Sequence, residues 1–105
     1  PIVVIETPHM ADAAAISARS AFASAGQRCT AARRLIVKNS VYDPLMEQLL
    51  PLTRKLMVGD PLGEPQPFMG PVIDNDAADR LAASFLELMT AGGRPLLHMR
   101  RTVPD

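Results

Sequence analysis

Cys29 is the residue of this chain best suited to covalent chemistry. It is the single cysteine among 105 residues, and an ionised thiol is the strongest nucleophile that side chains offer near neutral pH. It follows Gly26, a candidate end of a helix, and the polar pair Gln27-Arg28, so we expect it in a connection between a helix and a strand. The cationic Arg28 either favours the thiolate electrostatically or is a solvated side chain that points away.

Two general considerations oppose a catalytic Cys29. An isolated cysteine is most often a small, inert hydrophobic residue of the core. In parallel α/β sheets ligands bind at the carboxyl ends of the strands, whereas a helix-to-strand connection lies at the opposite end. A small, non-enzymatic α/β binding domain with an inert core Cys29 therefore stands as an alternative to an enzyme. Resistance of the thiol to alkylation in the folded chain would favour that alternative.

The remaining candidate residues form no recognised cluster. His9 and His98 lie far apart in the sequence, so a pair of either with Cys29 depends on the fold. One cysteine and two dispersed histidines give no zinc-binding spacing. Three aspartates resemble the start of a calcium loop, but the glycine and glutamate that such a loop needs are absent, so helix capping explains them better. These aspartates are Asp74, Asp76 and Asp79.

Composition limits the classes of partner. Eleven Lys plus Arg balance eleven Asp plus Glu, and aromatic residues make up 4%, which argues against nucleic acid and anionic membranes as partners. The pairs Arg33-Arg34 and Arg100-Arg101 are either sites for an anionic substrate or solvated charge at strand edges. No apolar run approaches the roughly 20 residues of a membrane span. A single cysteine cannot form an internal disulfide, which indicates a reducing, cytoplasmic setting.

The hydrophobic pattern predicts alternating strands and helices. Short β-branched runs indicate strands, and an Ala-rich stretch and two stretches of helical period indicate helices. Asp74-Asn75-Asp76 offers N-caps for the third helix, and Gly92-Gly93 ends it. The expected order is strand 2–5, helix 10–25, strand 33–38, helix 41–58, proline-rich loop 59–71, a helix ending at residue 90, and strand 94–99.

This β-α-β-α-α-β order predicts an α/β layer with parallel strands and right-handed crossovers. The unbroken apolar run at residues 2–5 indicates a strand buried on both faces of a parallel sheet. Pro51 is expected to kink or split the second helix, because proline removes a helical hydrogen bond. The chain starts directly in an apolar run, without Met, and ends just after another. We therefore expect either a piece of a larger core or a trimmed small domain.

Residues 22–33, FASAGQRCTAAR, resemble the cysteine signature of the aldehyde dehydrogenase superfamily. That signature has an aromatic or apolar residue, three spacers, Gly-Gln, one spacer, the nucleophilic Cys and then small residues. The resemblance spans the chain: residues 1–4 are similar to the strand after the family's Glu-Leu-Gly-Gly segment, and residues 58–73 to its proline-rich loop. Within the superfamily, residues 27–35, 67–70 and 92–97 most resemble the N-succinylglutamate 5-semialdehyde dehydrogenases of arginine catabolism.

The resemblance implies a thiolate mechanism. Cys29 would attack the aldehyde carbon, the adduct would lose hydride to NAD or NADP, and water would hydrolyse the resulting thioester. The backbone N–H of Cys29 would help to hold the oxyanion, Gly26 would allow a sharp turn, and Gln27 would give structural support. The substrate would be a small, anionic aldehyde, and the parent enzyme a cytoplasmic homo-oligomer.

The resemblance also implies that residues 1–105 are a fragment of the catalytic domain. The family's general-base Glu, the Asn of its oxyanion hole and its cofactor domain fall outside this chain, whose six glycines form no G-x-G-x-x-G or P-loop. NAD or NADP would thus be bound by other parts of the parent, and the isolated fragment is expected to be inactive. Another aldehyde dehydrogenase, including a CoA-acylating one, remains an alternative.

Overall fold

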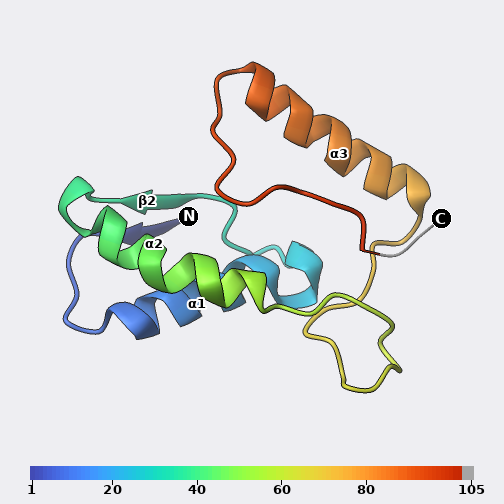
Figure 1. Ribbon diagram of the computed structural model, residues 1–105, viewed down its shortest axis with the longest axis horizontal. Helices are drawn as coiled ribbons and strands as arrows, with labels where there is room; N and C mark the ends of the chain where they lie inside the picture. The colour runs from blue at the N-terminus through green and yellow to red at the C-terminus, as the bar shows by residue number, and fades with distance from the viewer. Residues whose placement is uncertain (103–105) are drawn as a thin grey trace.

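The computed structural model describes residues 1–102 and shows a mixed α/β architecture (Figure 1). Its elements are β1 (Ile2–Val4), α1 (Met10–Phe22), the 3₁₀-helix η1 (Ala23–Gly26), β2 (Leu35–Val37), α2 (Asn39–Arg54) and α3 (Asn75–Thr90). The predicted α/β class is confirmed. None of the helices within residues 1–102 combines the length and the apolar character needed to cross a membrane.

The two strands form a parallel pair, as predicted. The chain leaves β1, runs through α1 and η1, and returns as β2 (Figure 1). The flanking residues extend the ladder, because the Ile2 N–H donates to the Arg34 carbonyl oxygen and the Lys38 N–H to that of Val4, each at 2.9 Å. The partners in register are Ile2 with Leu35, Val3 with Ile36, and Val4 with Val37.

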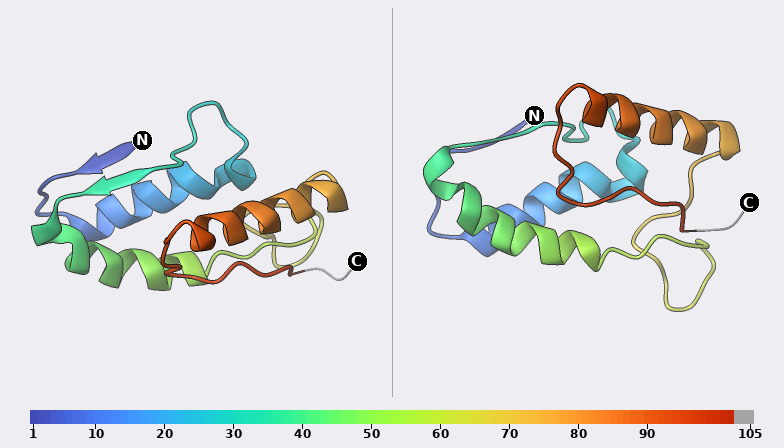
Figure 2. Two further views of the ribbon diagram at one scale, coloured as in Figure 1. Left: turned by 90° about the horizontal axis from the view of Figure 1, so that it is seen from above. Right: turned by 45° about the horizontal axis from the view of Figure 1, so that its top comes forward.

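Within residues 1–102, helices cover only one face of this sheet. The left view of Figure 2 shows α1 and α2 on the same side of the strands, and the core there consists of Val4, Ala14, Leu45 and Met46. On the opposite face Val3 is 58% and Ile36 55% exposed. The prediction that the first strand is buried on both faces is therefore wrong for this chain. Side chains alternate along a strand, and no element of residues 1–102 covers the second face.

The second helix is continuous through its prolines. α2 contains both Pro44 and Pro51, so the predicted split at Pro51 does not occur. Pro51 lies in the last turn, where a missing N–H removes only one bond near the end of the helix. Beyond α2, the predicted loop at residues 59–71 is confirmed. A bridge between Val58 and Met69 closes it.

The third helix has the termini that the sequence predicts. The Asp74 carboxylate accepts a hydrogen bond from the Ala77 N–H at 2.7 Å, which makes Asp74 the N-cap. At the other end Gly92 has φ +96°, and the Gly93 N–H donates to the Leu88 carbonyl oxygen at 2.9 Å. Within the part of the chain that the structure describes, no residue of α3 itself is buried.

The strand predicted at residues 94–99 does not form. A strand needs a neighbour with which to exchange backbone hydrogen bonds, and this segment instead runs along α3. The His98 ring lies edge-on to Phe85, with 6.4 Å between the ring centroids. Arg101 pairs with Asp79 and donates to the Asn75 carbonyl oxygen at 3.4 Å. Side-chain contacts with α3 thus replace strand pairing.

Candidate active site around Cys29

A left-handed turn precedes the cysteine. The predicted helix 10–25 ends at Phe22, because Ser24 and Ala25 both have φ +55° and Gly26 has φ +69°. Left-handed backbone costs a residue with a side chain about 1–2 kcal/mol, a penalty that glycine avoids. The Gln27 backbone N–H and its side-chain Nε2 both donate to the Ser24 carbonyl oxygen, at 3.1 and 3.3 Å. Gln27 thus braces this turn from two positions.

Cys29 itself lies on a tight turn between η1 and β2, in the helix-to-strand connection that the sequence predicts. The Ala31 N–H donates to the Arg28 carbonyl oxygen at 3.0 Å, and the Ala32 N–H donates to that of Ser20 at 3.1 Å. The second bond ties the turn to α1. The turn is therefore fixed at both of its ends.

The thiol is free and exposed, so the alternative of a buried, inert core cysteine is wrong for this structure. Within residues 1–102 no backbone or side-chain acceptor is bonded to the Cys29 N–H. A group that approaches the Sγ atom therefore meets an available backbone donor on the same residue. That arrangement suits addition to a carbonyl, whose oxygen gains negative charge as the thiolate attacks.

A hollow of about 260 Å³ lies beside this turn, and both neighbours of Cys29 line it. We call it the arginine hollow, since it joins Arg28 with Arg19 from the last turn of α1. Its full lining is Ile16, Arg19, Ser20, Ala23, Arg28, Thr30 and Ala31. Sequence reasoning missed Arg19. The available signal was its cationic side chain in the C-terminal half of the predicted helix 10–25, which leads into the cysteine connection.

Neither histidine is brought to the cysteine. His9 is the N-cap of α1, and its N–H donates to Thr7 Oγ1 at 3.0 Å. His98 packs against Phe85 on α3. In the described part of the chain no hydrogen bond joins Cys29 to either ring, so this structure contains no Cys–His pair.

The other charged candidates have structural contacts on α3. Asp74 caps the helix and Asp79 pairs with Arg101. Across residues 1–102 no group of three or more His, Cys, Asp or Glu side chains is arranged to hold a metal ion. Arg100 is exposed and lies beside this same α3 contact. None of these residues lines the arginine hollow.

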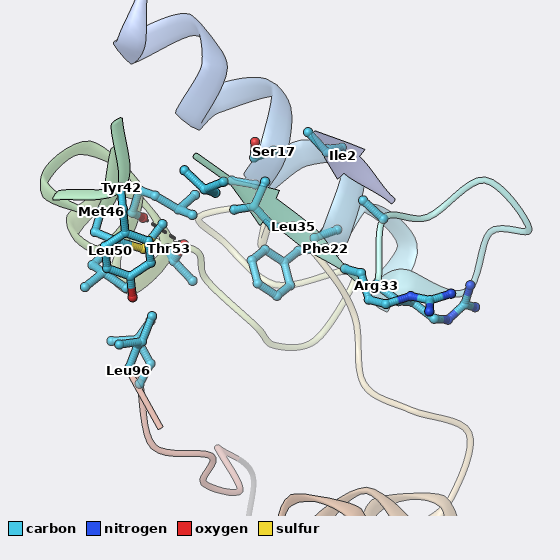
Figure 3. Close-up of a pocket in the computed structure, with 17 residues that line it drawn as sticks. Ile2, Ser17, Phe22, Arg33, Leu35, Tyr42, Met46, Leu50, Thr53 and Leu96 are labelled. Carbon is cyan, nitrogen blue, oxygen red and sulfur yellow. Dashed lines mark hydrogen bonds between the residues drawn. The ribbon is translucent and has the colours of Figure 1, made fainter. Parts of the chain in front are cut away.

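Arg33 and Arg34 line a different and larger groove of about 570 Å³. Figure 3 shows that its walls are mostly apolar side chains such as Phe22, Leu35 and Leu96, and that the Arg33 guanidinium points away from them. Neither Cys29 nor its two neighbours line this groove. The groove therefore has the character of a hydrophobic interior rather than of a catalytic site.

The residues present do not fit a dinucleotide. Pyrophosphate binding in α/β folds uses a glycine-rich turn between a strand and the N-terminus of a helix. Between β1 and α1 the chain reads IETPH, residues 5–9, without a glycine. The six glycines of the sequence nowhere give the spacing of such a turn.

Comparison with protein families gives a match over nearly the whole chain. The model of the aldehyde dehydrogenase family matches residues 1–104. The N-succinylglutamate 5-semialdehyde dehydrogenase of Novosphingobium aromaticivorans is 53% identical over 105 residues, which are 100% of this chain and 22% of the relative. The enzyme of the same name from Escherichia coli K12 is 38% identical over 101 residues, 95% of this chain and 20% of the relative.

Solved structures agree with this match. The 1-pyrroline-5-carboxylate dehydrogenase from Thermus with bound NAD superposes with a TM-score of 0.83 at 33% identity, over 99% of this chain and 20% of that one. An NAD-dependent aldehyde dehydrogenase from Sinorhizobium meliloti gives a TM-score of 0.81 at 33% identity, over 88% of this chain and 18% of that one. The chain thus spans about a fifth of the length of the proteins it matches. It belongs to the aldehyde dehydrogenase family.

Proposed function

We propose that this chain is the catalytic-domain segment that carries the nucleophile of an aldehyde dehydrogenase, and that the nucleophile is Cys29. The observation that carries the proposal is the exposed thiol on a hydrogen-bonded turn whose own N–H has no partner within residues 1–102. Family membership supports it, and residues 22–33 resemble the family's cysteine signature.

In the proposed reaction, the Cys29 thiolate adds to the carbonyl carbon of the aldehyde, and the carbonyl oxygen becomes an oxyanion. The Cys29 N–H donates to that oxyanion. The left-handed turn at residues 24–26 presents the thiol and the N–H from one short segment. The oxidant, NAD or NADP, would be bound by other parts of the enzyme, because the residues of this chain do not fit a dinucleotide.

The proposed substrate is N-succinylglutamate 5-semialdehyde, and the product is the corresponding carboxylate in arginine catabolism. Two relatives at 53% and 38% identity bear the name of this activity. The substrate carries two carboxylates, so it is anionic at neutral pH. We further propose that the parent enzyme lies in the cytoplasm, since a nucleophilic thiol has to remain reduced, and that it is a homo-oligomer, as the family resemblance implies.

A chimeric enzyme tests the proposal. In it, this chain replaces the matching segment of the Novosphingobium aromaticivorans relative. We expect the chimera to reduce NAD⁺ or NADP⁺ when N-succinylglutamate 5-semialdehyde is added. Cys29→Ser should lower kcat by about a thousandfold or more, because nothing else in the segment replaces the thiolate. The isolated 105-residue chain should show no oxidation of any aldehyde.

The matched control is Ser40→Ala, at an exposed position in the first turn of α2, which should leave kcat within about twofold. The proposal is wrong if Cys29→Ser retains activity within about tenfold of the unaltered chimera. It is also wrong if a folded chimera that binds the dinucleotide oxidises no aldehyde.

A further inference from the structure

The arginine hollow has a one-sided charge. Arg19 and Arg28 both line it, and none of its lining residues is acidic. Within residues 1–102 neither guanidinium has a carboxylate within 4.0 Å. Two cations without an internal counter-ion produce a positive potential that attracts anions from solvent. The hollow is therefore suited to an anionic group.

The remaining lining is suited to a short substrate rather than to a large cofactor. Ser20 and Thr30 add hydroxyl groups, and Ile16, Ala23 and Ala31 add small apolar contacts. A volume of about 260 Å³ is below the range of roughly 300–1,000 Å³ that is usual for drug-sized ligands. The hollow can therefore accept a carboxylate with a few methylene groups.

Position distinguishes this pair from the other arginines. Arg28 directly precedes Cys29, and Thr30 on its other side also lines the hollow, so the hollow lies beside the backbone of Cys29, whose own side chain is not part of the lining. Arg33 and Arg34 belong to the larger apolar groove. Of these four arginines, Arg19 and Arg28 line the hollow beside the Cys29 turn, and Arg33 and Arg34 do not.

We propose that Arg19 and Arg28 form a carboxylate-binding subsite that selects anionic over uncharged aldehydes. This inference rests on the proposed function, which supplies a substrate with two carboxylates. Arginine suits the task because its planar guanidinium binds a carboxylate through two parallel hydrogen bonds. Arg19 projects from α1, and Arg28 from the turn that the Ala32-to-Ser20 bond ties to that helix. The backbone positions from which these two exposed side chains extend are thereby held relative to each other and to Cys29.

The chimeric enzyme provides the kinetic test. Arg19→Gln and Arg28→Gln should each lower kcat/KM for N-succinylglutamate 5-semialdehyde by about 10- to 100-fold, as expected for the loss of a charge-assisted hydrogen bond. For hexanal, which has no carboxylate, kcat/KM should change by less than about threefold. For N-succinylglutamate 5-semialdehyde, the kcat/KM of Arg28→Lys should lie between those of the unaltered chimera and of Arg28→Gln, because lysine keeps the charge and loses the planar fork. The matched control is Arg34→Gln, which should change kcat/KM for neither substrate by more than about threefold.

Alkylation of the isolated chain provides a second test that needs no enzyme activity. The thiol of Cys29 is treated with iodoacetate, an anion, and with iodoacetamide, its uncharged analogue, and the ratio of the two rates is measured. Arg28→Gln should lower this ratio by about fivefold at low salt, which corresponds to about 1 kcal/mol between unit charges near 4 Å in water. The difference should shrink as salt is added. The ratio cancels any effect of Arg28 on the thiol itself.

Specific outcomes would overturn the subsite. Equal losses for the anionic aldehyde and for hexanal would show that the arginines act on the thiol or on folding. Unchanged kinetics for the anionic aldehyde, or an unchanged alkylation ratio, would show that they do not bind carboxylates. In each case the proposed function survives as long as oxidation depends on Cys29. Loss of all Cys29-dependent oxidation in the unaltered chimera refutes the proposed function instead, and the alkylation ratio still decides the subsite.

Discussion

Replacing Leu45 with alanine should remove a large part of the stability of this chain. Leu45 is 0% exposed and belongs to a small core with Val4, Ala14 and Met46. A buried Leu→Ala change costs about 3–5 kcal/mol, because it loses the transfer energy of the side chain and leaves a cavity. A domain of this length with so few buried residues is expected near the low end of ordinary stability, about 5 kcal/mol. The variant should therefore be close to unfolding at room temperature.

Urea titration followed by far-UV circular dichroism measures the effect. The unfolding midpoint of Leu45→Ala should fall, and its thermal midpoint should drop by about 12–25 °C. Leu62→Ala is the control, because Leu62 is 92% exposed and its loss should change the free energy of unfolding by less than about 0.5 kcal/mol. A loss below about 1 kcal/mol in Leu45→Ala, with an unchanged denaturant slope, would refute a shared core between α1 and α2.

Three further changes test separate features. Asp74→Ala removes the acceptor of the Ala77 N–H and should cost about 1 kcal/mol in urea unfolding; an unchanged midpoint would contradict the cap. Gly26→Ala places a Cβ 3.0 Å from the Ala21 carbonyl oxygen at φ +69°, so it should cost about 1–2 kcal/mol and alter the rate of Cys29 alkylation. Ile36→Lys should change the stability of the isolated chain by less than about 0.5 kcal/mol but lower the melting temperature of the chimera, where parallel sheets are covered on both faces. Equal effects in both would refute this last expectation.

Local signals account for what the sequence predicted correctly. The cap at Asp74 and the helix end at Gly92-Gly93 follow from side-chain rules that act over a few residues. The parallel pairing of the two strands follows from the β-α-β order, which periodicity reveals, together with the rule for crossover connections. The location of Cys29 between a helix and a strand follows from the same rules. These features need no knowledge of distant contacts.

Non-local contacts account for most of what it missed. The apolar run at 94–99 has strand character, but without a neighbouring strand its His98 packs against Phe85 of α3, and Arg101 just beyond it pairs with Asp79. The left-handed conformation of Ser24 and Ala25 has no signal in residue types that rarely adopt it. Arg19 is an ordinary helical arginine until the Cys29 turn folds back onto α1. The failures at residues 94–99 and at Arg19 thus involve contacts with other elements, whereas the left-handed turn is a local conformation that its residue types do not indicate.

The position of the nucleophile depends on the core through a short series of contacts. α2 packs against α1, whose Ala14 and Ala18 are 1% and 3% exposed, and such small side chains allow the helices to approach closely. α1 presents the Ser20 carbonyl oxygen that holds the Ala32 N–H, and that bond fixes the far end of the cysteine turn. Loosening the helix pair should therefore move the turn, although Cys29 is exposed and lies outside the core cluster. A core substitution that lowers stability without unfolding the chain should consequently change the reactivity of the thiol, whereas a substitution on α3, which buries no residue, should not.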